Sequence, residues 1–266
     1  MALLPLAVRK AVSKLDAGQS GGTAATGVIY LVATPLGNLE DITLRALRIL
    51  GEVSLIACED TRRTGRLLQH FQISKPLVSC HDHNEARRAS ELADRAAAGE
   101  SIALVSDAGT PLIADPGFRV VRAAIDRGVR VVPVPGPSAA VAALSVSGLP
   151  SHEFAFKGFL PAKSAKRRAA IRSVERSDST TVFYEAPHRI LAALADTCEL
   201  LGGSRRIALA RELTKLHEEV LRGPAASILE ALSARPSQKG EFVLVIGPRD
   251  DDETSGNRNT GAAPPP

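Results

Sequence analysis

The chain is poor in aromatic residues and in cysteine. Of its 266 residues, 3% are aromatic, none is tryptophan, and only Cys58, Cys80 and Cys198 are cysteine. So few aromatic side chains argue against the stacking platforms by which many proteins bind single-stranded nucleic acid. Three scattered cysteines form no disulfide framework and predict a reducing compartment. The core must therefore be built from Val, Leu, Ile and Ala, a composition that suits helices packed on a buried sheet.

Targeting and membrane-spanning signals are also missing. The N-terminal MALLPLAVRK has no positive segment before its apolar run, and Pro5 interrupts that run, so no signal peptide is expected. No apolar run is long enough to span a bilayer. We expect a cytoplasmic protein. Its net charge of +4 permits a polyanionic partner without requiring one.

Two phosphate-binding signatures and a zinc pattern are absent as well. The sequence contains no GxxxxGK[ST], and no GxGxxG follows its first apolar run, so ATP hydrolysis and dinucleotide binding lack support. Cys80, His81 and His83 match no established zinc spacing, and no second cluster adds ligands. We therefore expect no metal.

Composition and periodicity divide the chain into four segments. Residues 1–26 and 248–266 are polar or turn-prone and are expected to be a disordered extension and a disordered tail. In residues 27–149, apolar runs alternate with helical patterns, which predicts a βα-repeating domain with a mainly parallel sheet. Residues 150–247 contain five strand patterns and two helical patterns, which predicts a mixed or antiparallel sheet. The fold class is α/β in two domains.

Local signals predict where individual helices begin and end. One helix is expected over residues 41–50, stopped by Gly51, and another over residues 84–98, capped by Asn84 and ended by Gly99. In the second domain, helices are expected over residues 164–176 and 188–201.

Three loops rich in glycine and proline carry the clearest functional signal. TPLGN at residues 34–38, SDAGTP at 106–111 and PGPSA at 135–139 each follow a compact apolar run. Ligands of open α/β sheets bind at the carboxyl ends of the strands, and glycine lets a ligand approach the backbone. Each loop alone is also consistent with a structural turn, but together they predict one crevice that holds a cofactor. Asp107 or Asp115 would bind a ribose hydroxyl or a cationic group there, or else cap a turn.

Two further polar segments follow apolar runs. These are CEDTRRTG at residues 58–65 and CHDHNE at residues 80–85. They predict a polar pocket wall, in which Asp60 or His81 is a candidate general base.

A basic segment, KSAKRRAAIRSVER at residues 163–176, carries six Lys and Arg residues against one Glu. Such a run is either a solvated helix face or a phosphate-binding face. Arg62, Arg63 and Arg66 of the first domain are candidates to extend a phosphate-binding face.

The same segments, in order, resemble a known family. They are VATPLGNLEDIT, ACEDTRRTG, HDHNE, VSDAGTPLIADPG, PVPGPSAAVAALSVSGLP, GFLPAKSAKRR, FYEAPHRI, ARELTKLHEE and GEFVLVI. Over about residues 27–247 they resemble the ribosomal RNA small subunit methyltransferase I family, which belongs to the tetrapyrrole-methylase fold group of S-adenosylmethionine enzymes. The resemblance implies a two-domain homodimer with the cofactor in the cleft between the domains. It also implies methylation of the ribose 2′-hydroxyl of a cytidine in the decoding centre of 16S rRNA.

The resemblance also implies site residues. It places cofactor contacts on Pro35, Leu36, Gly37, Asp107, Ala108, Gly109, Thr110, Ser138, Ala139, Tyr184, Glu185, Ala210 and Leu213. It places rRNA phosphates against Arg62, Arg63, Lys163, Lys166, Arg167 and Arg168. Many family members continue into a small helical module, whereas here a short polar tail follows Gly247. The N-terminal extension is a second departure, to which we assign no function.

Methyl transfer to a hydroxyl requires in-line alignment and removal of the hydroxyl proton. As the base we rank Asp60 first, with Glu59 and His81 behind it, while Lys215 would stabilise the developing alkoxide. Asp60→Ala is then expected to abolish turnover without changing cofactor affinity. Two alternatives stay open: a tetrapyrrole methyltransferase, and a non-catalytic rRNA-binding factor that keeps the cofactor pocket.

Overall fold

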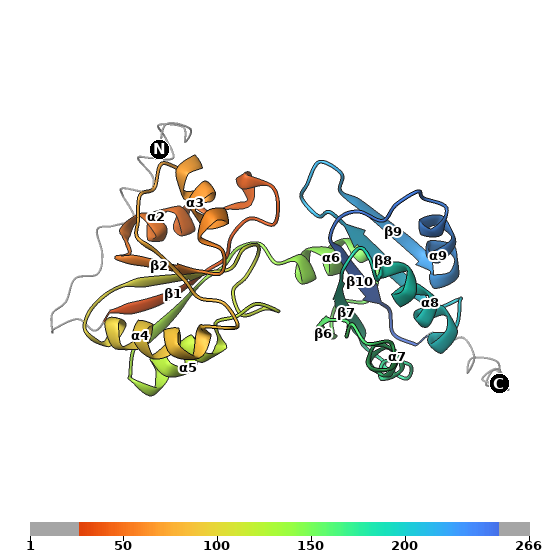
Figure 1. Ribbon diagram of the computed structural model, residues 1–266. Helices are drawn as coiled ribbons and strands as arrows, with labels where there is room; N and C mark the ends of the chain where they lie inside the picture. Colours follow the sequence, from red (N-terminus) through yellow and green to blue (C-terminus); the bar gives the residue numbers. More distant parts are fainter. Residues whose placement is uncertain (1–26, 250–266) are drawn as a thin grey trace, which may run out of the picture. The chain divides into compact units, whose positions relative to one another are not determined.

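The computed structural model describes residues 27–249, which fall into two compact units that divide between Ala139 and Ala140 (Figure 1). The division precedes the expected boundary at Leu149 because the helix that follows Ser138 belongs mostly to the second unit. The expected disordered extension, and the expected tail from residue 250 onward, lie outside the described residues. Within residues 27–249, no helix is long and apolar enough to cross a bilayer.

The first unit is a parallel five-stranded sheet in the order β3-β2-β4-β1-β5. Its strands are β1 Val28–Val32, β2 Leu55–Cys58, β3 Leu77–Ser79, β4 Ile102–Val105 and β5 Arg130–Val134. Its helices are the 3-10 turn η1 Leu39–Asp41 and the α-helices α2 Leu44–Glu52, α3 Thr61–His70, α4 Glu85–Ala97 and α5 Phe118–Asp126. Every strand pair is parallel, which confirms the expected βα alternation.

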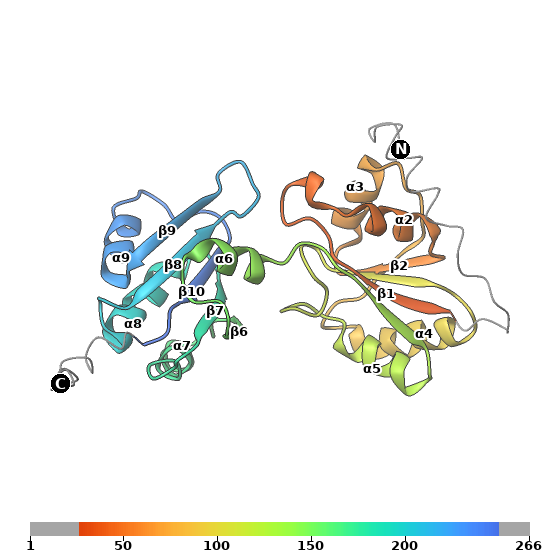
Figure 2. The same cartoon turned by 180° about the vertical axis from the view of Figure 1, so that it is seen from behind.

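Two apolar cores cover the two faces of this sheet, with α2 and α3 on one side and α4 and α5 on the other (Figures 1 and 2). Successive residues of β4 alternate between them: Ile102 and Leu104 pack with α4 and α5, whereas Ala103 and Val105 pack with α2 and α3. Burial on both faces explains why these strands are continuous apolar runs in the sequence.

Two helices of this unit differ at their ends from the sequence expectation, and in the second unit the helices expected over residues 164–176 and 188–201 are shorter, over residues 164–172 and 190–201. The helix after β1 begins at Leu44 because Thr43 caps it through a hydrogen bond from the Ala46 N–H, and Gly51 lies inside that helix instead of stopping it. Asn84 precedes α4 but makes no side-chain cap. Its side chain accepts the His81 N–H instead, so the amide shapes the preceding turn.

The second unit is a mixed five-stranded sheet in the order β6-β7-β10-β8-β9. Its strands are β6 Phe154–Phe159, β7 Thr180–Glu185, β8 Arg206–Arg211, β9 Glu219–Pro224 and β10 Phe242–Ile246. Its helices are α6 Ala139–Ser147, α7 Ser164–Arg172, α8 Ile190–Leu201 and α9 Ala225–Ser233, of which α9 was not expected. Only β6 and β7 pair in parallel, and the other pairs are antiparallel, as expected for a mixed sheet.

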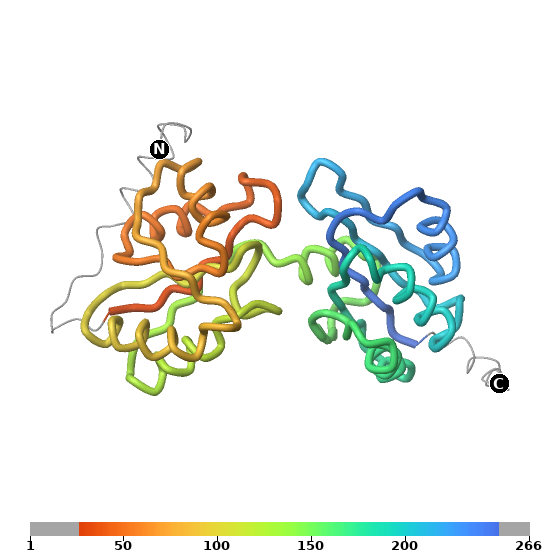
Figure 3. The backbone as a smooth tube through the Cα atoms, in the orientation of Figure 1, coloured from red at the N-terminus to blue at the C-terminus, as the bar shows by residue number. Residues whose placement is uncertain are grey.

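One large apolar core in this unit lies between the sheet and α7, α8 and α9. The opposite face meets α6, where the Ala140 N–H donates to the Tyr184 hydroxyl over 3.2 Å. Figure 3 follows the backbone from the red of β1, which lies between β4 and β5 in the first sheet, to the blue of β10, the central strand of the second.

Candidate active site

The three glycine- and proline-containing loops meet at one edge of the first sheet, because they follow the neighbouring strands β4, β1 and β5. Thr34 joins two of them: its backbone N–H and C=O pair with Gly109 over 2.9 Å each, and its hydroxyl donates to the Ser106 carbonyl over 3.1 Å. The Thr110 hydroxyl donates to the Pro137 carbonyl over 2.9 Å and so ties in the third loop. The three loops that carry the nine residues expected to contact the cofactor in this unit are therefore joined by hydrogen bonds into one framework.

Glycine is required at two junctions of this framework. Gly109 has a φ of +84°, and a Cβ there would lie 3.1 Å from the Leu36 side chain. A Cβ on Gly136 would lie 2.9 Å from the Cβ of Ala33. The loops approach one another this closely only because the side chains are missing.

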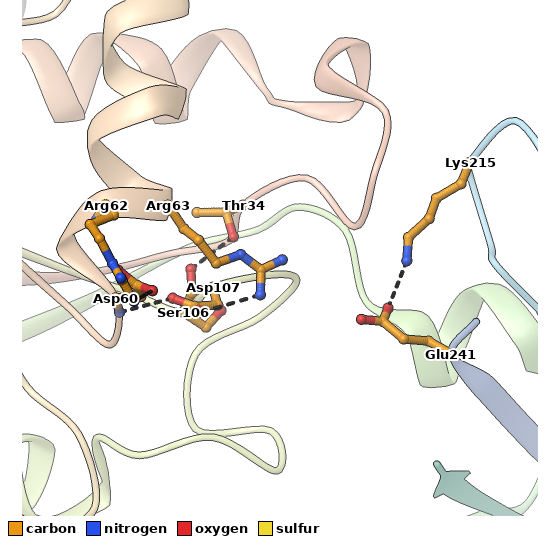
Figure 4. A network of polar contacts seen from close by, with 8 residues as sticks. All are labelled: Thr34, Asp60, Arg62, Arg63, Ser106, Asp107, Lys215 and Glu241. Carbon is orange, nitrogen blue, oxygen red and sulfur yellow. Dashed lines mark hydrogen bonds and ion pairs between the residues drawn. The ribbon is translucent and has the colours of Figure 1, made fainter. Parts of the chain in front are cut away.

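Asp107 connects this framework to the start of α3 (Figure 4). Its Oδ1 accepts the Asp60 backbone N–H over 3.0 Å, and its Oδ2 accepts from the Arg63 guanidinium over 3.3 Å. The loop after β4 and the loop after β2 are thus held together by one carboxylate.

Asp60 itself is a helix cap. Its Oδ1 accepts the Arg62 N–H over 2.8 Å at the N-terminus of α3, and its Oδ2 pairs with the Arg62 guanidinium over 3.0 Å. The hydrogen bonds from the Arg62 side chain and backbone lower the pKa of Asp60 to about 2. A carboxylate with so low a pKa accepts a proton poorly, which weighs against Asp60 as the base.

Glu59 is the neighbouring carboxylate and is in a different state. Burial, and then the charges of Asp107 and Asp82, raise its pKa. Asp115 belongs to the same acidic cluster: burial, followed by the charges of Glu59 and Asp107, raises its pKa to about 6. This end of the sheet concentrates negative charge and therefore favours a cationic ligand.

His81 faces the same region from the end of β3. The Asn84 side-chain oxygen accepts the His81 N–H, and its nitrogen donates to the Ser79 carbonyl, which fixes the orientation of the amide. That nitrogen lies 3.2 Å from His81 Nε2, so Nε2 accepts and Nδ1 carries the proton. Nδ1 is buried and has no partner among residues 27–249, so His81 offers a donor to a ligand more readily than a base. In the same residues, no three His, Cys, Asp or Glu side chains are grouped as a metal site requires.

The residues of the second unit that are expected to contact the cofactor do not all lie on one face of its sheet. Tyr184 and Ala210 are both opposite Val243 of β10 and so lie on the same face. Glu185 is one residue further along β7, and the neighbouring Phe183 belongs to the helix-covered core, so Glu185 points away from the Tyr184 face. Its buried carboxylate pairs with Arg189 at the start of α8 over 2.8 Å, which indicates a structural role.

Leu213 and Lys215 lie in the loop between β8 and β9. The Lys215 ammonium donates to Glu212 over 2.9 Å and to Glu241 over 3.1 Å. Burial alone would lower the pKa of Lys215, but the hydrogen bonds to these two carboxylates outweigh it and raise the pKa. Lys215 therefore stays charged, and the two carboxylates balance that charge. Figure 4 shows its contact with Glu241.

The basic helix α7 has two different faces. Arg167 is buried and donates to Asp196 of α8 over 2.8 Å, and Arg168 binds both Asp196 and Glu199. These two arginines hold α7 against α8 and are a structural pair. Lys163 and Lys166 are exposed and have no ion pair within the described chain, so they lie on the solvent face of the basic segment.

Comparison with known proteins identifies the family. The family model for Tetrapyrrole (Corrin/Porphyrin) Methylases matches residues 28–229. Ribosomal RNA small subunit methyltransferase I from Pseudomonas aeruginosa is 51% identical over 223 residues, covering 84% of this chain and 79% of that protein. The protein of the same name from Escherichia coli O157:H7 is 52% identical over 221 residues, covering 83% and 77%.

Solved structures share the fold at lower identity. Diphthine synthase superposes with a TM-score of 0.61 at 16% identity, covering 84% of this chain and 90% of the other. Uroporphyrin-III C-methyltransferase from Thermus thermophilus, complexed with S-adenosylhomocysteine, superposes with a TM-score of 0.57 at 20% identity, covering 83% and 97%. The α/β fold expected from the sequence is thereby confirmed. The chain belongs to the tetrapyrrole methylase family and, within it, to the ribosomal RNA small subunit methyltransferase I proteins.

Proposed function

We propose that this protein transfers a methyl group to the ribose 2′-hydroxyl of a cytidine in the decoding centre of 16S rRNA, acting as a homodimer in the cytoplasm. Its family membership supports the coarser statement, that it is an rRNA methyltransferase. The methyl donor is S-adenosylmethionine, as the methylase family and the S-adenosylhomocysteine bound by a structural neighbour indicate. The observation that carries the proposal is the meeting of three glycine-containing loops beside an acidic cluster.

The residues present fit this cofactor. S-adenosylmethionine supplies an electrophilic methyl group on a positively charged sulfur. The bare backbone at Gly109 leaves room that a Cβ would fill, and the carboxylates of Asp107, Glu59 and Asp115 favour a cation. We assign the cofactor contacts of the first unit to residues 35–37, 107–110 and 138–139. In the second unit, Tyr184, Ala210 and Leu213 keep their proposed role, and Glu185 acts by holding the turn to α8.

We propose Glu59 as the base. Its pKa is raised, and its carboxylate accepts no hydrogen bond from another described residue, so it is free to take the proton of the ribose hydroxyl. Asp60 caps α3, and the Nδ1–H of His81 is a donor that would orient the substrate. Lys215 stays the candidate for stabilising the alkoxide.

The rRNA contacts that remain available are Lys163 and Lys166 on α7 and Arg62 and Arg63 on α3. All four side chains are exposed. Arg167 and Arg168, which the resemblance also assigns to RNA, act indirectly by fixing α7 against α8. Charge reversal at these two arginines would test folding instead of RNA binding.

The test uses purified protein, radiolabelled S-adenosylmethionine and small ribosomal subunits from a strain that lacks this methylation. We expect label in 16S rRNA, and we expect less label with Lys163→Gln and Lys166→Gln combined. The absence of label, despite cofactor binding measured by calorimetry, would overturn the proposal. Methylation of a tetrapyrrole in a parallel assay would indicate the first alternative, a tetrapyrrole methyltransferase. RNA binding without methyl transfer would indicate the second, a non-catalytic rRNA-binding factor.

A further inference from the structure

A basic hollow lies at the first turns of α3. It has a volume of about 600 Å³ and is lined by Asp60, Arg62, Arg63 and Arg66. Arg62 is paired with Asp60 and Arg63 with Asp107, whereas Arg66 has no ion pair within residues 27–249. Three exposed guanidinium groups against one lining carboxylate favour an anion with several oxygens, and the guanidinium fork matches phosphate oxygens two at a time.

The Arg63–Asp107 pair is weak enough to be exchanged. It is a single contact of 3.3 Å, and the Arg63 side chain is 49% exposed. Ion pairs of this kind contribute little to stability, whereas an arginine that binds a phosphate with two parallel hydrogen bonds makes a stronger contact. A phosphate in the hollow would therefore compete successfully for Arg63.

Asp107 would stay in place after such an exchange. Its Oδ1 still accepts the Asp60 backbone N–H over 3.0 Å, so only Oδ2 is released. Asp107 also belongs to the loop after β4, where Thr34 and Gly109 fix the backbone on which the cofactor is expected. The released oxygen is then available to the cofactor.

We propose that the hollow binds a backbone phosphodiester of the RNA substrate, and that this phosphate draws Arg63 away from Asp107 and so strengthens cofactor binding. The inference rests on the proposed function in taking RNA as the ligand. It adds that RNA and cofactor bind with positive coupling through one arginine. Because binding linkage is reciprocal, S-adenosylmethionine must tighten RNA binding by the same factor.

The experiment measures the Kd of S-adenosylmethionine by calorimetry with and without saturating hexauridylate, which contains phosphodiesters but no cytidine. For the wild type we expect RNA to lower the Kd by about fivefold. Arg63→Gln should abolish this effect, and its Kd without RNA should already match the RNA-bound wild type. Arg66→Gln should weaken RNA binding, but saturating RNA should still lower the Kd of S-adenosylmethionine. Arg122→Gln, which removes an exposed ion pair on α5, is the control and should behave as the wild type.

Two results would overturn the inference: no effect of hexauridylate on the wild type, or an undiminished effect in Arg63→Gln. Inorganic phosphate should change the Kd by less than twofold, because it cannot also engage Arg62 and Arg66 through neighbouring phosphates. If inorganic phosphate lowered the Kd as much as hexauridylate does, RNA would be excluded as the specific ligand. If Arg63→Gln failed to fold, Asp107→Asn would test the same step. Its side-chain oxygen can still accept the Asp60 N–H, and this variant should also lose the coupling between RNA and cofactor binding. No methyl transfer occurs in this assay, so its outcome is independent of the methylation test.

Discussion

Glu59 and Asp60 are adjacent carboxylates with opposite electrostatic environments. Asp60 accepts hydrogen bonds from the Arg62 backbone and guanidinium, which hold its pKa at about 2. Glu59 is partly buried beside Asp107 and Asp82, which raises its pKa. We therefore propose, at the scale of single residues, that Glu59 accepts the proton, while Asp60 caps the first turn of α3.

Paired amide variants distinguish these roles. Glu59→Gln should lower kcat at least about 100-fold, the usual effect of losing a general base, while the Kd of S-adenosylmethionine changes less than twofold. Asp60→Asn should keep kcat within a few-fold because asparagine is an equally good helix cap. Single-turnover methylation and calorimetry give both quantities. The roles would have to be exchanged if Asp60→Asn were inactive and Glu59→Gln active.

Asp115 should give the stability a measurable pH dependence. Burial, with the charges of Glu59 and Asp107 added, raises its pKa to about 6 in the folded protein, above the usual value of about 4. The folded state therefore holds this proton more tightly, and the stability it confers is present below about pH 4 and lost as the pH rises to about 6.

Asp115→Asn removes that charge. Its free energy of unfolding should equal that of the wild type near pH 4 and exceed it by about 1 kcal/mol at pH 8, after allowance for solvent around the side chain. Urea denaturation at the two pH values measures the difference. Asp126→Asn, on an exposed turn of α5, is the matched control, and an equal effect of both variants at pH 8 would refute the assignment.

At the scale of elements, α7 combines a structural face with a functional face. Arg167 and Asp196 are both buried, with side chains 9% and 10% exposed, and they join α7 to α8. Removing one partner leaves an uncompensated buried charge, which is far more costly than the loss of an exposed pair.

Asp196→Ala should therefore lower the free energy of unfolding by about 3 kcal/mol or more. Replacing both partners by apolar residues, Arg167→Met with Asp196→Leu, should recover most of the loss. Glu199→Ala removes only the exposed partner of Arg168 and should leave stability unchanged within error. Urea titrations of the four proteins decide, and an Asp196→Ala protein as stable as the wild type would contradict the structural role of the pair.

If the exposed face of α7 binds RNA, its lysines should contribute to the salt dependence of the RNA affinity. If Lys163 and Lys166 each neutralise one phosphate, Lys163→Gln with Lys166→Gln should reduce the slope of log affinity against log salt by about 1.4. Fluorescence titrations with a labelled rRNA fragment from 50 to 200 mM salt measure the slope. An unchanged slope would remove α7 from the RNA-binding surface.

At the scale of the whole molecule, the sequence predicted the strands and the loops between them well. Apolar runs identified the five strands of the first sheet, and strand patterns identified the five of the second. Loops that follow neighbouring parallel strands necessarily share an edge. Helix α9 was missed because it follows β9 directly, and Pro224, at its N-cap, supplies no side-chain cap. Contacts between distant residues, such as Arg167 with Asp196, leave no local pattern.

The same limits apply to the candidate site. The sequence pattern predicted Asp60, Glu59 and His81 at the ends of strands. Their chemical roles, however, depend on neighbours that the local sequence does not specify. The capping bond to Arg62 and the burial of Glu59 emerge only from the folded chain. Glu185 was predictable in part, because strand alternation already separates it from Tyr184.

Alkaline digestion of the labelled RNA decides which atom carries the methyl group. Small subunits labelled with radioactive methyl by this protein are digested with alkali, which cleaves RNA only where a free 2′-hydroxyl is present. We predict that the label is recovered in an alkali-resistant dinucleotide that begins with cytidine. Label recovered in a mononucleotide would place the methyl group on a base and contradict ribose methylation.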